Sequence, residues 1–135
     1  MNPEDYVSYP VALALKKAGF DWKCDHYYCA FDNETDVRFW SIHPAQSQNG
    51  LRTPKDAVAA DAPTLAQAQK WLREKGVAVS VQASEIQGEL WYSADIISSE
   101  GLSELVDGGF DYMAYELALS AGIAAALELI EMKGE

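Results

Sequence analysis

Apolar and polar positions alternate first with the period of a helix and then with that of a strand. One apolar face has the helical spacing i, i+3, i+4, i+7 and consists of Val11, Ala14, Leu15 and Ala18. It predicts a helix from Ser8 to Ala18 that ends at Gly19. Two stretches rich in aromatic and β-branched residues follow, at 26–30 and 37–42, with a polar turn between them. They predict a β-hairpin.

The same order returns in the second half of the chain. Thr64 and Gln67 form a capping box that opens a helix ending at Gly76. Residues 77–83 alternate with a period of two, and Gln87-Gly88 predicts the turn to a partner strand over residues 89–97. One face of that strand carries Leu90, Tyr92, Ala94 and Ile96, and the other carries Glu89, Trp91, Ser93 and Asp95.

Between and after these units the pattern changes. Residues 43–63 contain three prolines and no period, which predicts a long loop. Residues 98–109 form an acidic connector in which we expect a short turn of helix around Leu102–Leu105. Asp111 is expected to cap a last helix from Tyr112 to Met132, whose wide apolar face predicts burial against the sheet or a second subunit.

The elements together predict an α+β fold. We expect an antiparallel sheet of about four strands in two helix–hairpin units, followed by the long C-terminal helix. The length of 135 residues predicts a single domain over residues 1–135, interrupted by the loop at 43–63.

Charge narrows the expected partners. The formal net charge is −11, and residues 76–132 contain ten acids but no Lys or Arg. Such a surface repels phosphate, so we expect no direct contact with nucleic acid and, instead, a basic protein partner. The N-terminus has no signal-peptide pattern, and the longest apolar run is too short for a bilayer. We therefore expect a cytoplasmic protein that does not contact a membrane.

Two kinds of candidate site remain. The residues able to ligate a metal are Cys24, His26, Cys29 and His43. Their C-x-H-x2-C spacing matches no common zinc signature, so we expect no bound metal or other cofactor. Partner binding is the alternative, with aromatic anchors and exposed acids as the expected contacts: Trp40, Trp91, Glu89, Asp95, Glu100 and Glu104.

Several segments resemble short proteins encoded by prophages and mobile elements of gut bacteria. The run from Ala62 to Lys75 carries this resemblance, as does the opening Tyr6–Tyr9 with a helix that ends Lys17-Ala18-Gly19. The closing helix, rich in Ala, Glu and Leu, is also similar. No activity attaches to these proteins, so the resemblance implies only a phage-derived context inside a bacterial cell.

The sequence therefore predicts a non-enzymatic, acidic protein-interaction module of a phage-derived element. A sharper form of this hypothesis is nucleic-acid mimicry, in which the acids occupy the basic groove of a host protein. A homodimer through the last helix is also expected from its wide apolar face. The alternative hypothesis is a small-ligand or metal-binding protein, or an enzyme, that uses the Cys/His hairpin with Cys29 as the reactive thiol.

Overall fold

The computed structural model describes residues 5–31, 36–41 and 58–133. The fold is α+β, as predicted, and ends in a long C-terminal helix. The four expected hairpin strands are present, but each hairpin has a third strand, so there are two three-stranded antiparallel sheets. The chain divides into two compact units, residues 6–64 and residues 65–135 together with 1–5. The division into two units does not test the prediction of a single domain over residues 1–135, which therefore stays a prediction.

The unit of residues 6–64 contains one helix and the sheet β2-β1-β3. Its elements are α1 (Tyr9–Lys17), β1 (His26–Phe31), β2 (Asp36–Ser41) and β3 (Val58–Asp61). β3 lies inside the range predicted as loop 43–63, so that prediction is wrong at residues 58–61, which pair with β1. The preceding part of that range, residues 43–57, lies outside the described residues.

Local contacts tie α1 to this sheet. Val11, Ala12 and Leu15 are the buried residues of α1, and Gly19 ends the helix region with φ of 98°. The segment before α1 is held on both sides: the amide of Val7 donates to the Pro63 carbonyl at 3.1 Å, and the Tyr28 hydroxyl donates to the Val7 carbonyl at 2.5 Å. These bonds fix the start of the unit beside its last residues.

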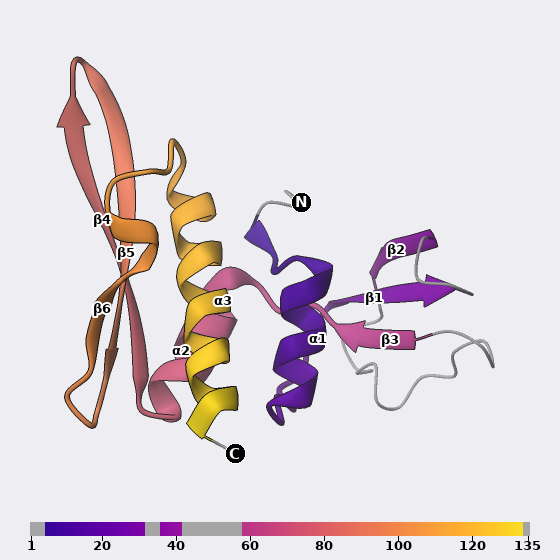
Figure 1. The fold of residues 1–135 in the computed structure, drawn as a ribbon. Coiled ribbons are helices and arrows are strands. Elements are labelled where there is room, and N and C mark those ends of the chain that lie inside the picture. The colour runs from indigo at the N-terminus through magenta and orange to yellow at the C-terminus, as the bar shows by residue number, and fades with distance from the viewer. Residues whose placement is uncertain (1–4, 32–35, 42–57, 134–135) are drawn as a thin grey trace. The chain divides into compact units, whose positions relative to one another are not determined.

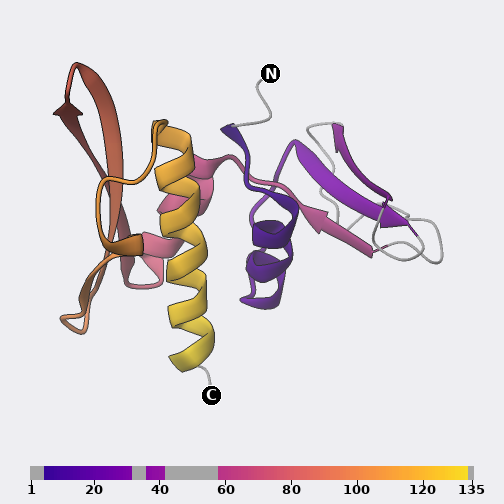
Figure 2. The same ribbon diagram turned by 45° about the horizontal axis from the view of Figure 1, so that its top comes forward.

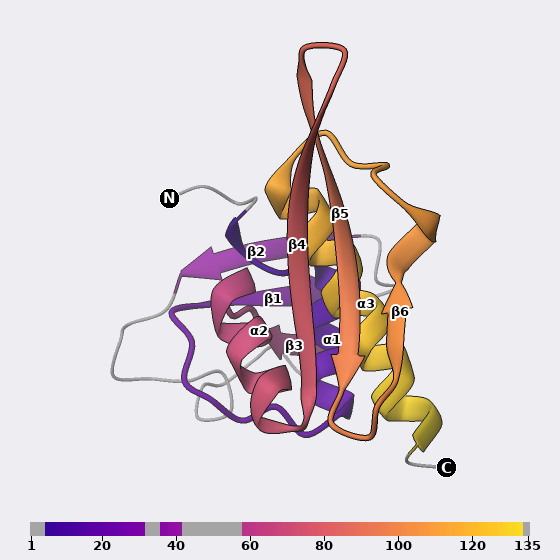
Figure 3. The same ribbon diagram turned by 90° about the vertical axis from the view of Figure 1, so that its left-hand side faces the viewer.

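The unit of residues 65–135 contains the sheet β4-β5-β6 and two long helices. Its elements are α2 (Leu65–Glu74), β4 (Val77–Ile86), β5 (Glu89–Ser98), β6 (Ser103–Leu105), the 3-10 turn η3 (Val106–Gly108) and α3 (Tyr115–Lys133). Figures 1 and 2 show α2 and α3 on one side of this sheet. Figure 3 looks onto the other side, where the three strands lie in front of the helices.

Close packing holds the helices to that side of the sheet. The Gln69 side chain of α2 donates through Nε2 to the Val79 carbonyl at 2.7 Å. Gly122 of α3 is so near the sheet that an added Cβ would lie 2.5 Å from Val79 Cγ1 and 3.2 Å from Ala94 Cβ. Val77, Val79, Ala94 and Ile96 are buried there, which confirms the predicted inward face over this part of the hairpin. Nearer the turn the prediction fails, because Leu90 of the same face is 57% exposed.

Two predictions about the segment before α3 are wrong. Residues 103–105, expected as helix, form β6 because they pair with Asp95–Ile97. The last helix begins at Tyr115, and Asp111 does not cap it, because Tyr112 forms a β-bridge with Tyr92 that keeps the chain extended. The backbone bonds of this bridge measure 2.7 and 3.2 Å.

The apolar residues of α3 are buried on one side of the helix and exposed elsewhere on it. Its buried residues lie along one stripe: Ala118, Leu119, Gly122, Ile123, Ala126 and Leu127. Leu117 of the same helix is 58% exposed, so the wide apolar face predicted for this helix is not buried throughout. In the part of the chain that the structure describes, no helix has the length and apolar character needed to cross a bilayer.

Candidate partner-binding face

The turn between β4 and β5 fixes which side chains share a face. Gln87 and Gly88 have φ of 53° and 83°, as in a two-residue turn whose twist matches the strands. The Gly88 amide donates to Glu85 Oε2 at 2.5 Å across this turn. The resulting register pairs Ile86 with Glu89 and Ser84 with Trp91. A slip of one residue would place every side chain on the opposite face, so this turn sets the composition of both faces.

We call the side of the sheet opposite the helices the Trp91 face. Its members on β4 and β5 alternate with the residues that face the helices, and Ser93 among them is itself buried: Ala78, Ser80, Gln82, Ser84, Ile86, Glu89, Trp91, Ser93, Asp95 and Ile97. β6 adds Leu105 opposite Asp95 and Ser103 opposite Ile97. Within residues 65–133, both α-helices lie on the other side (Figures 1 and 3). Exposed Ile97 and Leu105 make this face partly apolar.

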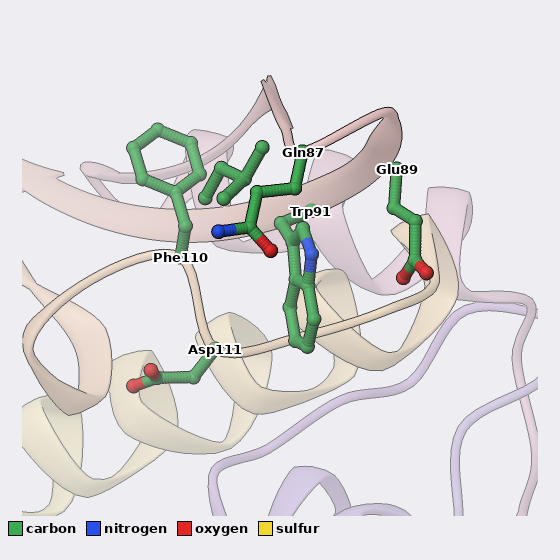
Figure 4. Close-up of a pocket in the computed structure, with 6 residues that line it drawn as sticks. Gln87, Glu89, Trp91, Phe110 and Asp111 are labelled. Atoms are coloured by element: carbon green, nitrogen blue, oxygen red, sulfur yellow. The ribbon is translucent and has the colours of Figure 1, made fainter.

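A hollow of about 450 Å³ opens at the turn end of this face. It is lined by Ile86, Gln87, Glu89, Trp91, Phe110 and Asp111. Figure 4 shows the Trp91 indole between Glu89 on one side of the view and Phe110 and Asp111 on the other, with Gln87 beside it. Ile86 is 42% exposed and Phe110 38% exposed, so two apolar side chains flank the half-buried indole in reach of solvent.

The loop before α3 reaches the hollow through the Tyr92–Tyr112 bridge, which places Phe110 and Asp111 beside the turn end of β5. The Tyr112 hydroxyl donates to the Asp107 carboxylate. That bond, with burial and the charges of Asp107 and Asp111, raises the pKa of Tyr112 to about 12. Tyr92 and Tyr115 also meet edge to face, with ring centroids 6.1 Å apart. These contacts hold the loop residues that line one side of the hollow.

The acids are at the surface, but they do not form one cluster. Of the ten in residues 76–132, eight are exposed and two, Asp95 and Glu116, are half-buried. Glu89 and Asp95 share the Trp91 face, about 20 Å apart at six residues along one strand. Glu104 pairs with Ile96 and belongs to the other face, while Glu100 lies in the turn before β6.

The predicted partner-binding residues are therefore only partly brought together. Trp91, Glu89 and Asp95 lie on one face, whereas Glu100 and Glu104 do not join them. Trp40 belongs to β2, opposite Tyr27, in the other unit, and its side chain lies outside what the structure describes. Ile86, Gln87, Phe110 and Asp111 were missed as lining residues. The Gln87-Gly88 turn was the signal for the first two, and no local signal points to Phe110.

Of the four Cys and His residues of the hairpin, the structure describes the side chains of Cys24 and His26. Cys24 is buried, and its thiol donates to the Trp22 carbonyl at 3.5 Å. Burial, with the nearby charges of Asp61 and Asp25, raises the pKa of Cys24 to about 12. The thiolate that a metal or a nucleophilic mechanism requires is therefore strongly disfavoured.

His26 is buried at the start of β1, with its ring 4.7 Å from that of Tyr6. The backbone of Cys29 lies in β1, while its side chain and all of His43 fall outside the described residues. Among the residues that the structure describes, no three His, Cys, Asp or Glu side chains gather as a metal site would need. The geometry described here gives the Cys/His hypothesis no support.

Comparison with family models, with curated proteins and with solved structures finds no match to this chain.

Proposed function

We propose that this chain is a non-enzymatic protein-interaction module that binds a basic partner protein through the Trp91 face. The observation that carries the proposal is an indole-lined hollow on an acidic unit: residues 76–132 contain no Lys or Arg, and none of their ten acids is buried. The cytoplasmic setting and the phage-derived context expected from the sequence belong to the same proposal.

Charge and apolar contact have separate roles in this proposal. The acids provide a field that speeds the approach of a basic surface and rejects acidic ones. This attraction acts over about 8 Å at physiological salt and weakens at higher ionic strength. Trp91, Phe110 and Ile86 provide the contacts that hold the partner, since aromatic anchors in desolvated hollows carry much of the energy of an interface.

The sharper form of the proposal is nucleic-acid mimicry. A surface with this charge repels phosphate, so it does not suit nucleic acid itself but suits the basic groove of a protein that binds nucleic acid. The acids on the Trp91 face, Glu89 and Asp95, are spaced along one strand and would contact such a groove together. Competition by duplex DNA or RNA for the captured partner would support mimicry, and simultaneous binding of both would contradict it.

The test compares two charge reversals that change the net charge equally. Tagged protein captures partners from bacterial lysate, and the bound partner is then purified and titrated against Glu89→Lys, on the Trp91 face, and Glu128→Lys, exposed on α3. We expect binding that salt weakens and that Glu89→Lys weakens at least about fivefold more than Glu128→Lys. Binding that neither salt nor Glu89→Lys changes would overturn the proposal.

A homodimer through α3 is a second proposal, supported by the exposure of Leu117 at 58% on that helix. An exposed leucine on a helix suits a self-complementary contact, in which it meets its copy across a two-fold axis. Light scattering should then give twice the chain mass of 14.8 kDa, and Leu117→Glu should return it to one chain. A single-chain mass for the unchanged protein at high concentration would contradict the dimer.

A further inference from the structure

The hollow beside Trp91 combines three kinds of group that a flat cation requires. The indole of Trp91 supplies an electron-rich aromatic face, and Glu89 supplies a carboxylate from the same strand. Gln87 supplies a side-chain amide whose oxygen can accept a hydrogen bond. Figure 4 shows the Trp91 indole with the Glu89 carboxylate to one side of it and the Gln87 amide and Phe110 to the other.

We infer that this hollow receives one arginine side chain of the partner. The inference rests on the proposed function, because it names the group through which a basic partner would be held. A guanidinium can stack on the Trp91 ring on the side of Glu89 while its edge donates forked hydrogen bonds to that carboxylate. Lysine can satisfy the charge but not the stacking and the forked hydrogen bonds together.

Electrostatics favours this occupant over others of similar size. No Lys or Arg occurs between residues 76 and 132, so an anionic ligand would meet Glu89 and Asp111 without a compensating base from this stretch. Figure 4 shows the Asp111 carboxylate turned away from the indole. Asp111 therefore contributes attraction at longer range, whereas Glu89 is placed for direct contact.

A second hollow, lined by residues of the same unit, provides an internal contrast. It has about 370 Å³ and is lined by Arg73, Gly76, Val77, Ala78, Ile97, Ser98 and Ser99. Among those residues there is a cation but neither an acid nor an aromatic ring. The arrangement of a cation over an indole also occurs elsewhere in this chain, where Lys75 Nζ lies 5.2 Å from the centre of the Trp71 ring. The chemistry proposed for Trp91 repeats that contact with a partner's cation.

The experiment uses short capped peptides with a single central arginine, lysine or citrulline, where citrulline keeps the shape of arginine without its charge. Each is titrated into the full-length protein while the indole N–H signal of Trp91 is followed by NMR, after assignment by Trp91→Phe. We expect the arginine peptide to shift this signal. The lysine peptide should bind at least about threefold more weakly, and the citrulline peptide more weakly still. Equal shifts from arginine and citrulline would overturn the inference.

Matched variants test the roles of the two acids. Glu89→Gln should weaken binding of the arginine peptide about fivefold or more, and Asp111→Asn should weaken it less. Glu128→Gln on α3 should not change this binding measurably. Failure of this inference and failure of the proposed function are distinguishable. Salt-sensitive capture of a protein that Glu89→Lys weakens, without any response of Trp91 to arginine, would contradict the arginine site alone. Absence of such capture, with a clear response to arginine, would contradict only the larger proposal.

Discussion

At Gly122, helix α3 packs closely against the β4-β5-β6 sheet. A methyl group at this position would lie 2.5 Å from Val79 Cγ1 and 3.2 Å from Ala94 Cβ, closer than carbon atoms pack in proteins. Val79 is buried and β-branched, so it has little freedom to turn away. We therefore predict that Gly122→Ala destabilises the protein, although alanine is the better helix former.

The magnitude follows from two opposing effects. Overpacking a buried site costs about 1–3 kcal/mol, and replacing glycine by alanine inside a helix gains about 1 kcal/mol. The net loss expected for Gly122→Ala is therefore about 0–2 kcal/mol. Val79→Ala removes the clashing atom and alone costs about 1.5–3 kcal/mol. In that background Gly122→Ala should become neutral or stabilising, by up to about 1 kcal/mol, so the coupling between the two sites is up to about 3 kcal/mol.

The assay is urea unfolding followed by circular dichroism and by tryptophan fluorescence, with agreement of the two probes as the test of two-state behaviour. Ala125→Gly, at a half-buried position of the same helix, measures helix propensity without an added clash. It should cost about 1 kcal/mol. Gly122→Ala could instead stabilise the protein with Val79 intact by as much as Ala125→Gly destabilises it. That result would contradict the close packing of α3 against Val79.

Two further predictions follow from shifted pKa values. The pKa of Cys24 is raised from 9.0 to about 12, which lowers the fraction of reactive thiolate at pH 8. In the Cys29→Ser variant, Cys24 should therefore react with iodoacetamide about a thousandfold more slowly in the folded protein than in urea. Equal rates would contradict the burial of Cys24. Tyr112 has a pKa raised from 10.0 to about 12, so its bond to Asp107 stabilises the fold below pH 10 and is lost as the pH rises toward 12. Tyr112→Phe should reduce the fall in urea midpoint between pH 9 and pH 12; an unchanged fall would contradict this role.

The hairpin β4–β5 could be predicted because its information is local. Its residues alternate with a period of two, and Gln87-Gly88 favours the positive φ values that a two-residue turn requires. The face carrying Glu89, Trp91 and Asp95 follows directly from that register. The same reasoning gave α2, which ends before Gly76, where φ is 89°.

The elements that were missed depend on contacts distant in the sequence. β6 has only three residues, too few to show a period, and it exists because it pairs with Asp95–Ile97. The start of α3 is delayed by the bridge between Tyr92 and Tyr112, which are twenty residues apart. Neither segment has a strong local preference against helix, so the pairing with β5 decides their conformation.

The candidate site was half predictable for the same reason. Trp91 and Glu89 could be assigned to one face from the strand period, but the hollow between them and the loop needs Phe110 and Asp111, which arrive through the Tyr92–Tyr112 bridge. Glu89 and Asp95 could be placed beside Trp91 from the strand period, but the acids outside the hairpin could be counted and not placed. Glu104 pairs with Ile96 and so belongs to the face opposite Trp91, a result of β6 that the sequence pattern did not contain.

Charge alone does not identify where a partner binds, because the acids of residues 76–132 lie on both faces of the sheet and on α3. A field summed over all of them would attract a basic protein to many orientations, and a single charge reversal would then have the same effect anywhere. The Trp91 face differs because an indole, an apolar rim and a carboxylate meet in one hollow. If Glu89→Lys and Glu128→Lys weaken a partner equally, attraction is collective and the hollow is incidental. If only Glu89→Lys weakens it, the interaction is local, and the contacts around Trp91 determine its specificity.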